Sequence, residues 1–111
     1  PPVTGQDADI DAVQRIVKGE QYMTVYKPFK AEADAAVAMA VALGRGESLR
    51  KIATTTTDSP TTRHIPSVLL TPRAVTVDKI KPTLLKDGMY RIDEICTAEL
   101  RPACEKDGLT R

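Results

Sequence analysis

The stretch VTGQDADIDAVQRIVKGEQYMTVYKP, residues 3–28, decides the fold of this chain. An apolar run over residues 3–5 ends in glycine, and a second run over residues 22–26 is rich in the β-branched and aromatic residues that favour strands. Between these runs, apolar residues recur at the helical period, at Ile10, Val13, Ile16 and Val17. The stretch therefore predicts a strand, a helix and a second strand.

Two charged residues, Asp7 and Lys27, directly follow the two predicted strands. Strands joined through a helix form a right-handed crossover and run parallel, so both strands end at the same edge of the sheet. That edge is where open α/β sheets bind small polar ligands. We expect the carboxylate of Asp7 and the ammonium group of Lys27 to lie side by side as a candidate ligand site.

Each of these residues also has a simpler explanation. Asp7 or Asp9 can cap the helix that follows, because a carboxylate there accepts hydrogen bonds from backbone N–H groups. A lone lysine such as Lys27 is usually a solvated surface residue. Gln6 is the weaker site candidate, because side chains alternate along a strand and that of Gln6 points away from Asp7. Tyr26 likewise points away from Lys27 and is expected in the core.

The rest of the chain predicts further helices and short strands. Residues 29–43 form a helix with a narrow stripe of small apolar residues, which suits close packing on a sheet. Residues 44–65 lose this periodicity and predict a turn followed by a polar loop or irregular strand. Residues 67–71, with an extension at 74–77, predict a short buried strand or connecting segment. A helix is expected over residues 79–86.

Cys96 and Cys104 are the only cysteines of the chain. On one continuous helix they would lie about 12 Å apart along the axis, too far for a disulfide, but Pro102 favours a break that lets a tight loop close the bridge. Two reduced thiols are the alternative. The disulfide is favoured because the cysteine spacing has neither the zinc form nor the redox form.

Composition excludes several function classes. The 111 residues, 41% of them hydrophobic, suffice for one small domain. Sixteen basic and fifteen acidic residues are spread without a basic block, which argues against nucleic-acid binding. His64 has no second histidine, cysteine or carboxylate at ligand spacing, so it indicates a loop histidine and no metal site. No nucleophile has a partner base, and we do not expect an enzyme.

Four ordered blocks carry a resemblance to a known family: TGQDAD at residues 4–9, QRIVKGEQYMTVYKP at 14–28, PSVLLTP at 66–72 and KDG at 86–88. The blocks resemble the C-terminal part of the sugar-binding proteins of ABC importers, which are type I periplasmic binding proteins, and among these the members that bind xylose. Such proteins have two Rossmann-like lobes joined by three crossing segments that close around a sugar.

The resemblance implies an α/β fold with a Rossmann-like three-layer α/β/α arrangement and parallel strands, of which this chain is the C-terminal part of the second lobe. It divides the chain into three segments. Residues 1–65 form a strand-helix-strand-helix unit with a polar loop, residues 66–77 a strand that crosses the hinge, and residues 78–111 the C-terminal helices with the disulfide.

The same resemblance implies a function. Asp7 is expected to accept hydrogen bonds from the hydroxyl groups of xylose or a related monosaccharide and Lys27 to donate them, without a cofactor. The parent protein would carry a signal peptide, act outside the cytoplasm as a periplasmic or cell-surface lipoprotein, and deliver sugar to an ABC permease. The alternative is the effector-sensing domain of a sugar-responsive transcription regulator, which would be cytosolic with reduced cysteines.

The chain also has the features of a truncated protein. It begins with two prolines directly before a strand, and it has no tryptophan to stack on a sugar ring. We therefore expect little sugar affinity from this chain alone. The exposed sheet edge at residues 3–5 is expected to pair with a complementary N-terminal fragment or with a second copy.

Overall fold

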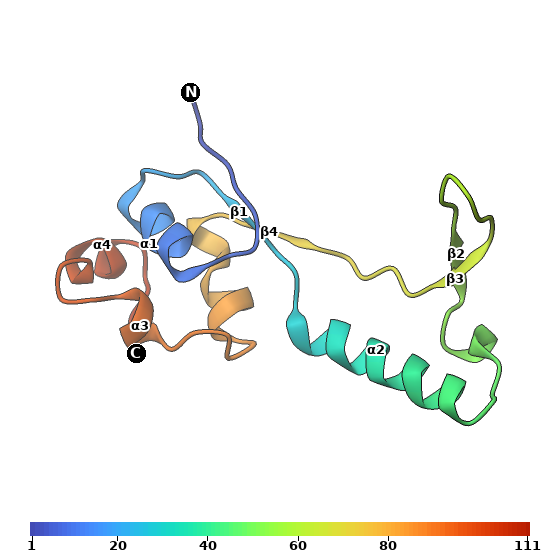
Figure 1. Cartoon of the computed structure of the whole chain (residues 1–111). Helices are drawn as coiled ribbons and strands as arrows, with labels where there is room; N and C mark the ends of the chain where they lie inside the picture. Colours follow the sequence, from blue (N-terminus) through green and yellow to red (C-terminus); the bar gives the residue numbers. More distant parts are fainter. The chain divides into compact units, whose positions relative to one another are not determined.

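The computed structural model describes all 111 residues, and the chain divides into two compact units (Figure 1). Unit 1 comprises Pro1–Lys27 and Pro72–Arg111, and unit 2 comprises Pro28–Thr71. The division into segments 1–65, 66–77 and 78–111 was based on the resemblance to a two-lobed protein, and it stays a prediction. No helix combines the length and the apolar character that crossing a membrane requires.

Unit 1 contains four kinds of regular structure. Its elements are α1 (Ile10–Lys18), β1 (Thr24–Tyr26), β4 (Arg73–Val75), the 3₁₀-helix η2 (Val77–Lys79), the π-helix η3 (Lys81–Leu85), α3 (Ile92–Ile95) and α4 (Arg101–Lys106).

Helix α1 forms where the apolar periodicity predicted it. Its N-terminus is capped by Asp9, whose Oδ1 accepts a hydrogen bond from the N–H of Ala12 at 3.0 Å. Its C-terminus ends at Gly19, which adopts a left-handed conformation with φ of 82°. The residues at the helical period, Val13, Ile16 and Val17, are buried.

The segment before α1 lies alongside β1. Thr4 forms a parallel bridge with Met23, and the N–H of Gly5 donates to the carbonyl of Met23 at 3.1 Å. Strand β1 also pairs antiparallel with β4, with Val25 opposite Ala74. The named strands thus pair antiparallel and the parallel contact is a single bridge, too few strands for a layered sheet. The α/β class is supported, whereas the three-layer parallel arrangement is not confirmed.

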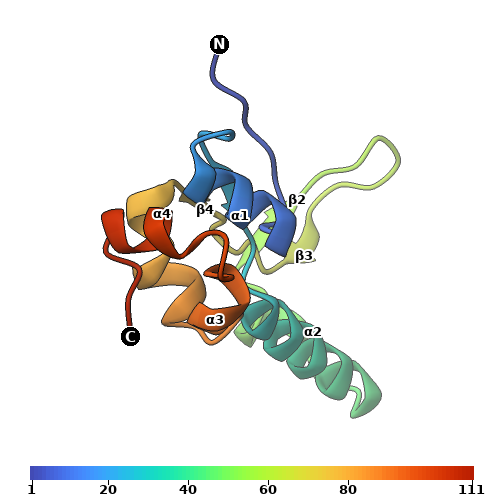
Figure 2. The ribbon, with the colours of Figure 1, turned by 90° about the vertical axis from the view of Figure 1, so that its left-hand side faces the viewer.

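The core of unit 1 lies between these short strands and the C-terminal helices. Helix α1 contacts α3 and α4, and both ribbon views show the three helices close together (Figures 1 and 2). Several side chains at this centre are completely buried, namely Val13, Val75, Ile80, Leu84 and Ile95. The apolar residues of unit 1 therefore form one continuous core.

The predicted disulfide joins Cys96, directly after α3, to Cys104 in α4, with the two Cα atoms 6.0 Å apart. The helical break lies between α3 and α4, as the bridge requires. Pro102 lies in the first turn of α4, where the missing N–H has no helical partner to lose. This proline therefore starts a helix rather than breaking one.

The helix expected over residues 79–86 has a different form. The N–H of Leu85 donates to the carbonyl of Ile80 at 3.2 Å, five residues back, as in a π-helix. Pro82 has no N–H to donate, and the hydroxyl of Thr83 donates to the carbonyl of Lys79 at 2.6 Å. These local bonds replace the regular α-helical ladder.

Unit 2 contains α2 (Phe29–Gly44), the 3₁₀-helix η1 (Leu49–Lys51), β2 (Thr55–Thr57) and β3 (Ile65–Ser67). Strands β2 and β3 form an antiparallel hairpin with Thr56 opposite Pro66. His64 lies in the connecting loop and is exposed, as expected. Its backbone N–H donates to the Oδ1 of Asp58 at 2.8 Å. The threonine run thus supplies a strand.

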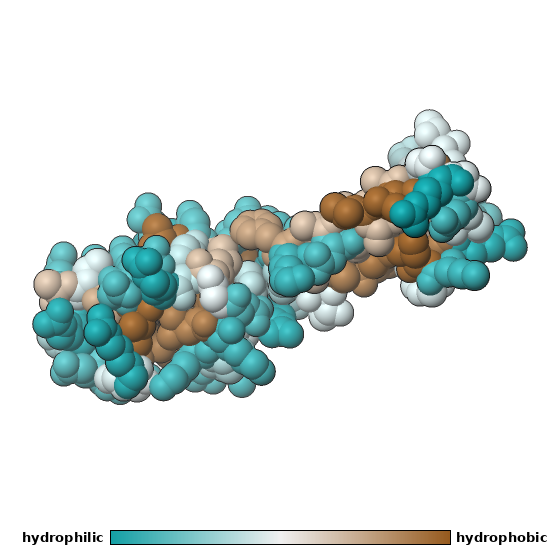
Figure 3. Space-filling model, turned by 90° about the horizontal axis from the view of Figure 1, so that it is seen from below, coloured by the Kyte–Doolittle hydropathy of each residue, from teal (hydrophilic) through white to brown (hydrophobic).

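Helix α2 was predicted to pack on a sheet through a stripe of small apolar residues. Within this chain only Ala42 of α2 is buried, while Val37 and Leu43 are about three-fifths exposed, at 61% and 62%. Hydrophobic side chains accordingly gather on the surface of unit 2 (Figure 3). Nothing within unit 2 covers the stripe, so unit 2 by itself does not provide the predicted packing on a sheet.

Candidate ligand-binding site

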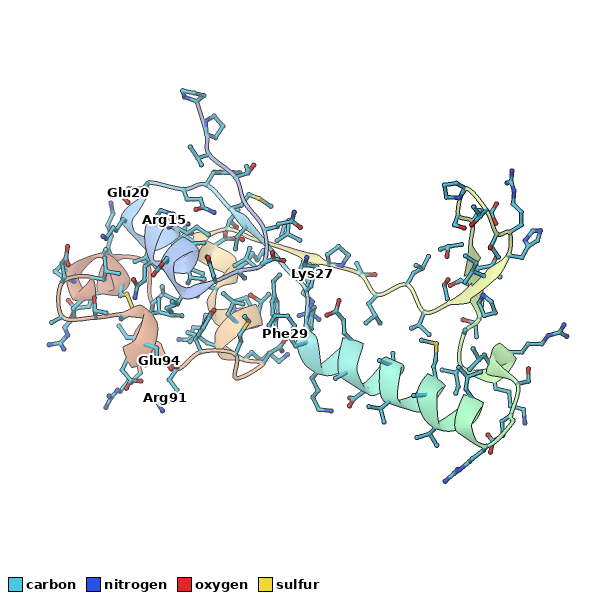
Figure 4. All side chains as sticks on the ribbon, viewed as in Figure 1. Arg15, Glu20, Lys27, Phe29, Arg91 and Glu94 are labelled. Atoms are coloured by element: carbon cyan, nitrogen blue, oxygen red, sulfur yellow. A yellow bond between two sulfur atoms is a disulfide. The ribbon has the colours of Figure 1, made fainter.

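Asp7 and Lys27 lie side by side in unit 1. The Nζ of Lys27 lies 2.6 Å from the Oδ1 of Asp7, and both side chains are exposed, at 41% and 64% respectively. Lys27 directly follows β1, as Figure 4 shows. The fold therefore brings the two charges together as the strand-helix-strand pattern predicted, whereas their contact with a ligand stays a prediction.

Gln6 joins this pair, against the expectation from strand alternation. The Nζ of Lys27 donates to the Oε1 of Gln6 at 3.4 Å. Asp7 has a φ of 80°, in the left-handed region, so the alternation of a strand ends at Gln6. Lys27 can then contact both Gln6 and Asp7. We call Gln6, Asp7 and Lys27 the rim cluster.

The capping role weighed for Asp7 belongs to Asp9. It is Asp9 that accepts from the N–H of Ala12, two residues beyond the rim cluster. Asp7 instead remains attached to the neighbouring strand, since its N–H donates to the carbonyl of Val25 at 2.8 Å. The backbone of Asp7 is thus fixed by the sheet while its carboxylate faces Lys27.

Gln21 contacts the two backbone segments that lead to the rim cluster. The amide of Gln21 accepts from the Nε of Arg15 at 3.0 Å and donates to the carbonyl of Met23 at 3.0 Å. A Cβ atom at Gly5 would lie 3.0 Å from the Nε2 of Gln21, so glycine permits this close approach. Sequence reasoning noted Gly5 only as the end of a strand.

Tyr26, the residue before Lys27, lies in β1 and belongs to the core of unit 1. Its ring is buried, as expected, and its hydroxyl donates to the Oδ2 of Asp87 at 3.2 Å. Burial, followed by the negative charge of Asp87, raises the pKa of Tyr26 above its usual value. The hydroxyl therefore remains a donor at neutral pH.

Two further residues hold the backbone directly behind Asp7, and sequence reasoning did not find them. The N–H of Ala8 donates to the Oγ1 of Thr24 at 3.2 Å, and the hydroxyl of Tyr90 donates to the carbonyl of Ala8 at 2.9 Å. Tyr90 is 82 positions from Ala8, so no local pattern could have indicated the contact.

The chemistry of the rim cluster suits a ligand rich in hydroxyl groups. A carboxylate accepts several hydrogen bonds, an ammonium group donates up to three, and a carboxamide does both. Bonds that involve a charged partner are shorter and stronger than neutral ones. Surface hollows such as the one beside the disulfide are lined by other residues, and the side chains of Asp7 and Lys27 are exposed to solvent.

Known proteins similar to this chain bind sugars. No protein-family model matches the chain. It is 41% identical over 93 residues to the D-xylose-binding periplasmic protein of Escherichia coli, a match that covers 84% of this chain and 27% of that protein. A carbohydrate transporter solute-binding protein from Chloroflexus aurantiacus, solved with D-glucose, superposes with a TM-score of 0.76 at 31% identity, over 84% of this chain and 26% of that one.

A second solved structure agrees with these matches. The ABC transporter solute-binding protein from Clostridium phytofermentans, with bound β-D-glucose, superposes with a TM-score of 0.70 at 28% identity, over 86% of this chain and 29% of that chain. The chain is thus homologous to sugar-binding solute-binding proteins, and the resemblance found in the four sequence blocks is confirmed. It spans about a quarter of their length.

Proposed function

We propose that this chain is part of the sugar-binding component of an ABC importer, a receptor without enzymatic activity. The observation that carries the proposal is the rim cluster of Gln6, Asp7 and Lys27, in a chain whose relatives are sugar-binding proteins. Polar groups that converge at the end of a strand are what a small hydroxylated ligand requires. The relatives are binding proteins, which fits a non-enzyme.

The ligand class is a monosaccharide, with D-xylose first. The E. coli relative is named for D-xylose, and both solved neighbours contain glucose. Asp7 would accept hydrogen bonds from sugar hydroxyls, Lys27 would donate to them, and Gln6 would do either. The fixed directions of these bonds would distinguish sugars that differ only in stereochemistry.

The parent protein would act outside the cytoplasm and deliver its sugar to an ABC permease. The relative from E. coli is periplasmic, which supports an extracytoplasmic location, either in a periplasm or as a cell-surface lipoprotein. The disulfide between Cys96 and Cys104 fits an oxidising compartment. A cytosolic transcription regulator is less favoured, because its cysteines would be reduced, and titration of free thiols in the purified protein distinguishes the two.

The chain would be the C-terminal part of the second lobe of a type I binding protein, and its partner would be the complementary part of that protein. Two surfaces support this partner. Val3, at the edge of the parallel bridge, is 56% exposed, and α2 presents apolar side chains that nothing in unit 2 covers. Unpaired strand edges and apolar helices both favour association.

Titration calorimetry with D-xylose and D-glucose tests the proposal on two proteins. One is the 111-residue chain, and the other is a hybrid in which the chain replaces the matching 93 residues of the E. coli relative. We expect no measurable binding to the chain alone, because an open surface leaves hydrogen bonds in exchange with water. We expect the hybrid to bind sugar.

A folded hybrid that binds neither sugar contradicts the proposed function. Micromolar binding by the chain alone contradicts the expectation that a complementary part completes the site. Light scattering on the chain with and without the remainder of the relative identifies the partner: a one-to-one complex supports the complementary part, and a stable homodimer supports a second copy.

A further inference from the structure

The backbone turn between the rim cluster and α1 is unusual. Asp7 and Ala8 are consecutive non-glycine residues in the left-handed region, with φ of 80° and 51°. L-residues rarely occupy that region, because the Cβ atom approaches the carbonyl oxygen. Such a conformation persists only where surrounding contacts fix it, and it often occurs at functional sites.

Two side chains fix this turn through the backbone of Ala8. Ala8 is completely buried, its N–H donates to the Oγ1 of Thr24, and its carbonyl accepts from the hydroxyl of Tyr90. Thr24 is itself completely buried in β1. A buried backbone group that loses its partner is strongly disfavoured, so either contact holds the chain in the observed turn.

The turn decides where the carboxylate of Asp7 lies. The N–H of Asp7 donates to the carbonyl of Val25, and Ala8 is held on its other side by Thr24 and Tyr90, so the position of Asp7 is defined from both directions. If Ala8 were released, the backbone could relax toward an ordinary conformation. The carboxylate of Asp7 would then move away from the Nζ of Lys27.

We propose that Thr24 and Tyr90 are positioning residues for the sugar site. Through the backbone of Ala8 they hold the left-handed turn that places the carboxylate of Asp7 beside the ammonium group of Lys27. Neither residue needs to touch the sugar. The inference that these residues serve sugar binding rests on the proposed function, but their effect on the rim cluster can be measured without any sugar.

The chain offers a matched control for each test variant. Thr24→Val and Tyr90→Phe remove the two hydroxyls, and Thr24→Ser keeps the acceptor oxygen. Thr83→Val removes the hydroxyl of another buried threonine of unit 1, which donates to Lys79. Tyr26→Phe removes the hydroxyl of a second tyrosine of the unit 1 core, which donates to Asp87.

Crystal structures of the 111-residue variants test the positioning itself. In Thr24→Val and Tyr90→Phe we expect the separation of Asp7 Oδ1 and Lys27 Nζ to exceed ~4 Å, the limit for an ion pair. Thr24→Ser and both control variants should keep the pair. An unchanged turn and ion pair in Thr24→Val and in Tyr90→Phe overturn the proposal. If Thr24→Val does not fold, Tyr90→Phe still tests the proposal. Tyr90→Phe leaves the carbonyl of Ala8 without this partner, whereas Thr24→Val leaves its N–H without one.

The hybrid protein tests whether this positioning serves binding. We expect Thr24→Val and Tyr90→Phe to weaken D-xylose affinity about tenfold or more, as loss of one hydrogen bond to a charged group does. Thr24→Ser and the two controls should remain close to the unmodified hybrid. Equal losses of affinity in controls and test variants would show a purely structural role. If the unmodified hybrid binds no sugar, the proposed function fails, while the crystal structures still decide the positioning role.

Discussion

The ammonium nitrogen of Lys27 lies 2.6 Å from the carboxylate of Asp7, although the two residues are far apart in the sequence: Lys27 follows β1, and Asp7 follows the segment that lies alongside β1. Lys30 and Asp34 form a pair with the same separation, but these two lie one turn apart on α2. Local helix geometry brings the second pair together, whereas only the tertiary fold brings the first together. The two pairs therefore provide a natural comparison between a candidate site and an ordinary surface pair.

Removing the charges of the rim cluster should affect binding more than stability. In the hybrid protein, Asp7→Asn and Lys27→Met should each weaken D-xylose affinity at least tenfold, because a charged hydrogen bond to the sugar is lost. Each should change the free energy of unfolding by no more than about 1 kcal/mol, as for other exposed ion pairs. Calorimetry and urea denaturation measure the two quantities.

Lys30→Met and Asp34→Asn are the matched controls for these variants. Both should leave D-xylose affinity unchanged, since the pair is exposed on α2 in unit 2 and outside the rim cluster. If Asp7→Asn binds sugar as tightly as the unmodified hybrid, the assignment of Asp7 to the site is wrong.

Alkaline pH should destabilise unit 1 through Tyr26. Burial and then Asp87 raise the pKa of Tyr26 in the folded protein, whereas an unfolded tyrosine ionises at about 10. The contribution of Tyr26 to the free energy of unfolding is therefore fully present below pH 10. It is lost as pH rises through the raised pKa of the folded protein, because Tyr26 loses its proton at a lower pH in the unfolded state. Urea denaturation between pH 8 and 11 should show this fall in the free energy of unfolding.

The Tyr26→Phe variant should show a smaller fall over the same pH range. Part of the effect should remain, because burial also raises the pKa of Tyr90. Identical pH dependence in the wild type and the variant would show that Tyr26 does not carry the effect.

Local patterns in the sequence sufficed for part of this structure. Apolar periodicity and a terminal glycine located α1, and cysteine spacing around a helix break identified the bridge between Cys96 and Cys104. The position of Asp7 and Lys27 followed from two strands joined by a helix. Each of these inferences depends on neighbours along the chain or on one simple topological rule.

The remaining features depend on distant contacts. Tyr90 and Ala8 form a hydrogen bond although they are 82 positions apart. Strands β1 and β4 pair although the whole sequence of unit 2 separates them, so no short window of sequence contains both partners of either contact. The contact of Gln6 with Lys27 arises from the left-handed φ of Asp7, which residue types alone do not indicate. Helix α2 was predicted correctly from its periodicity, but periodicity does not show what covers a helix, and within unit 2 only Ala42 of α2 is buried.

Reducing the disulfide should destabilise unit 1. In the chain-entropy model a bridge that closes a loop of this length contributes about 2 to 3 kcal/mol, because it restricts the unfolded state. Urea denaturation with and without dithiothreitol should show this difference. A Cys96→Ala and Cys104→Ala double variant should unfold like the reduced protein and should be insensitive to the reductant; sensitivity in the double variant would trace the effect to something else.

Two valines should distinguish a core that this chain completes from a surface that another polypeptide completes. Val13 in α1 is completely buried, whereas Val37 in α2 is 61% exposed. Val13→Ala should cost about 2 kcal/mol of unfolding free energy in both the chain and the hybrid, because it opens a cavity in an existing core. Val37→Ala should have almost no effect in the chain but should cost about 1 to 2 kcal/mol in the hybrid, if the complementary part covers α2 there as we propose. Urea denaturation of the four variants and of the two unmodified proteins measures these differences. A Val37→Ala variant with no effect in either background would mean that the complementary part leaves this face of α2 in water.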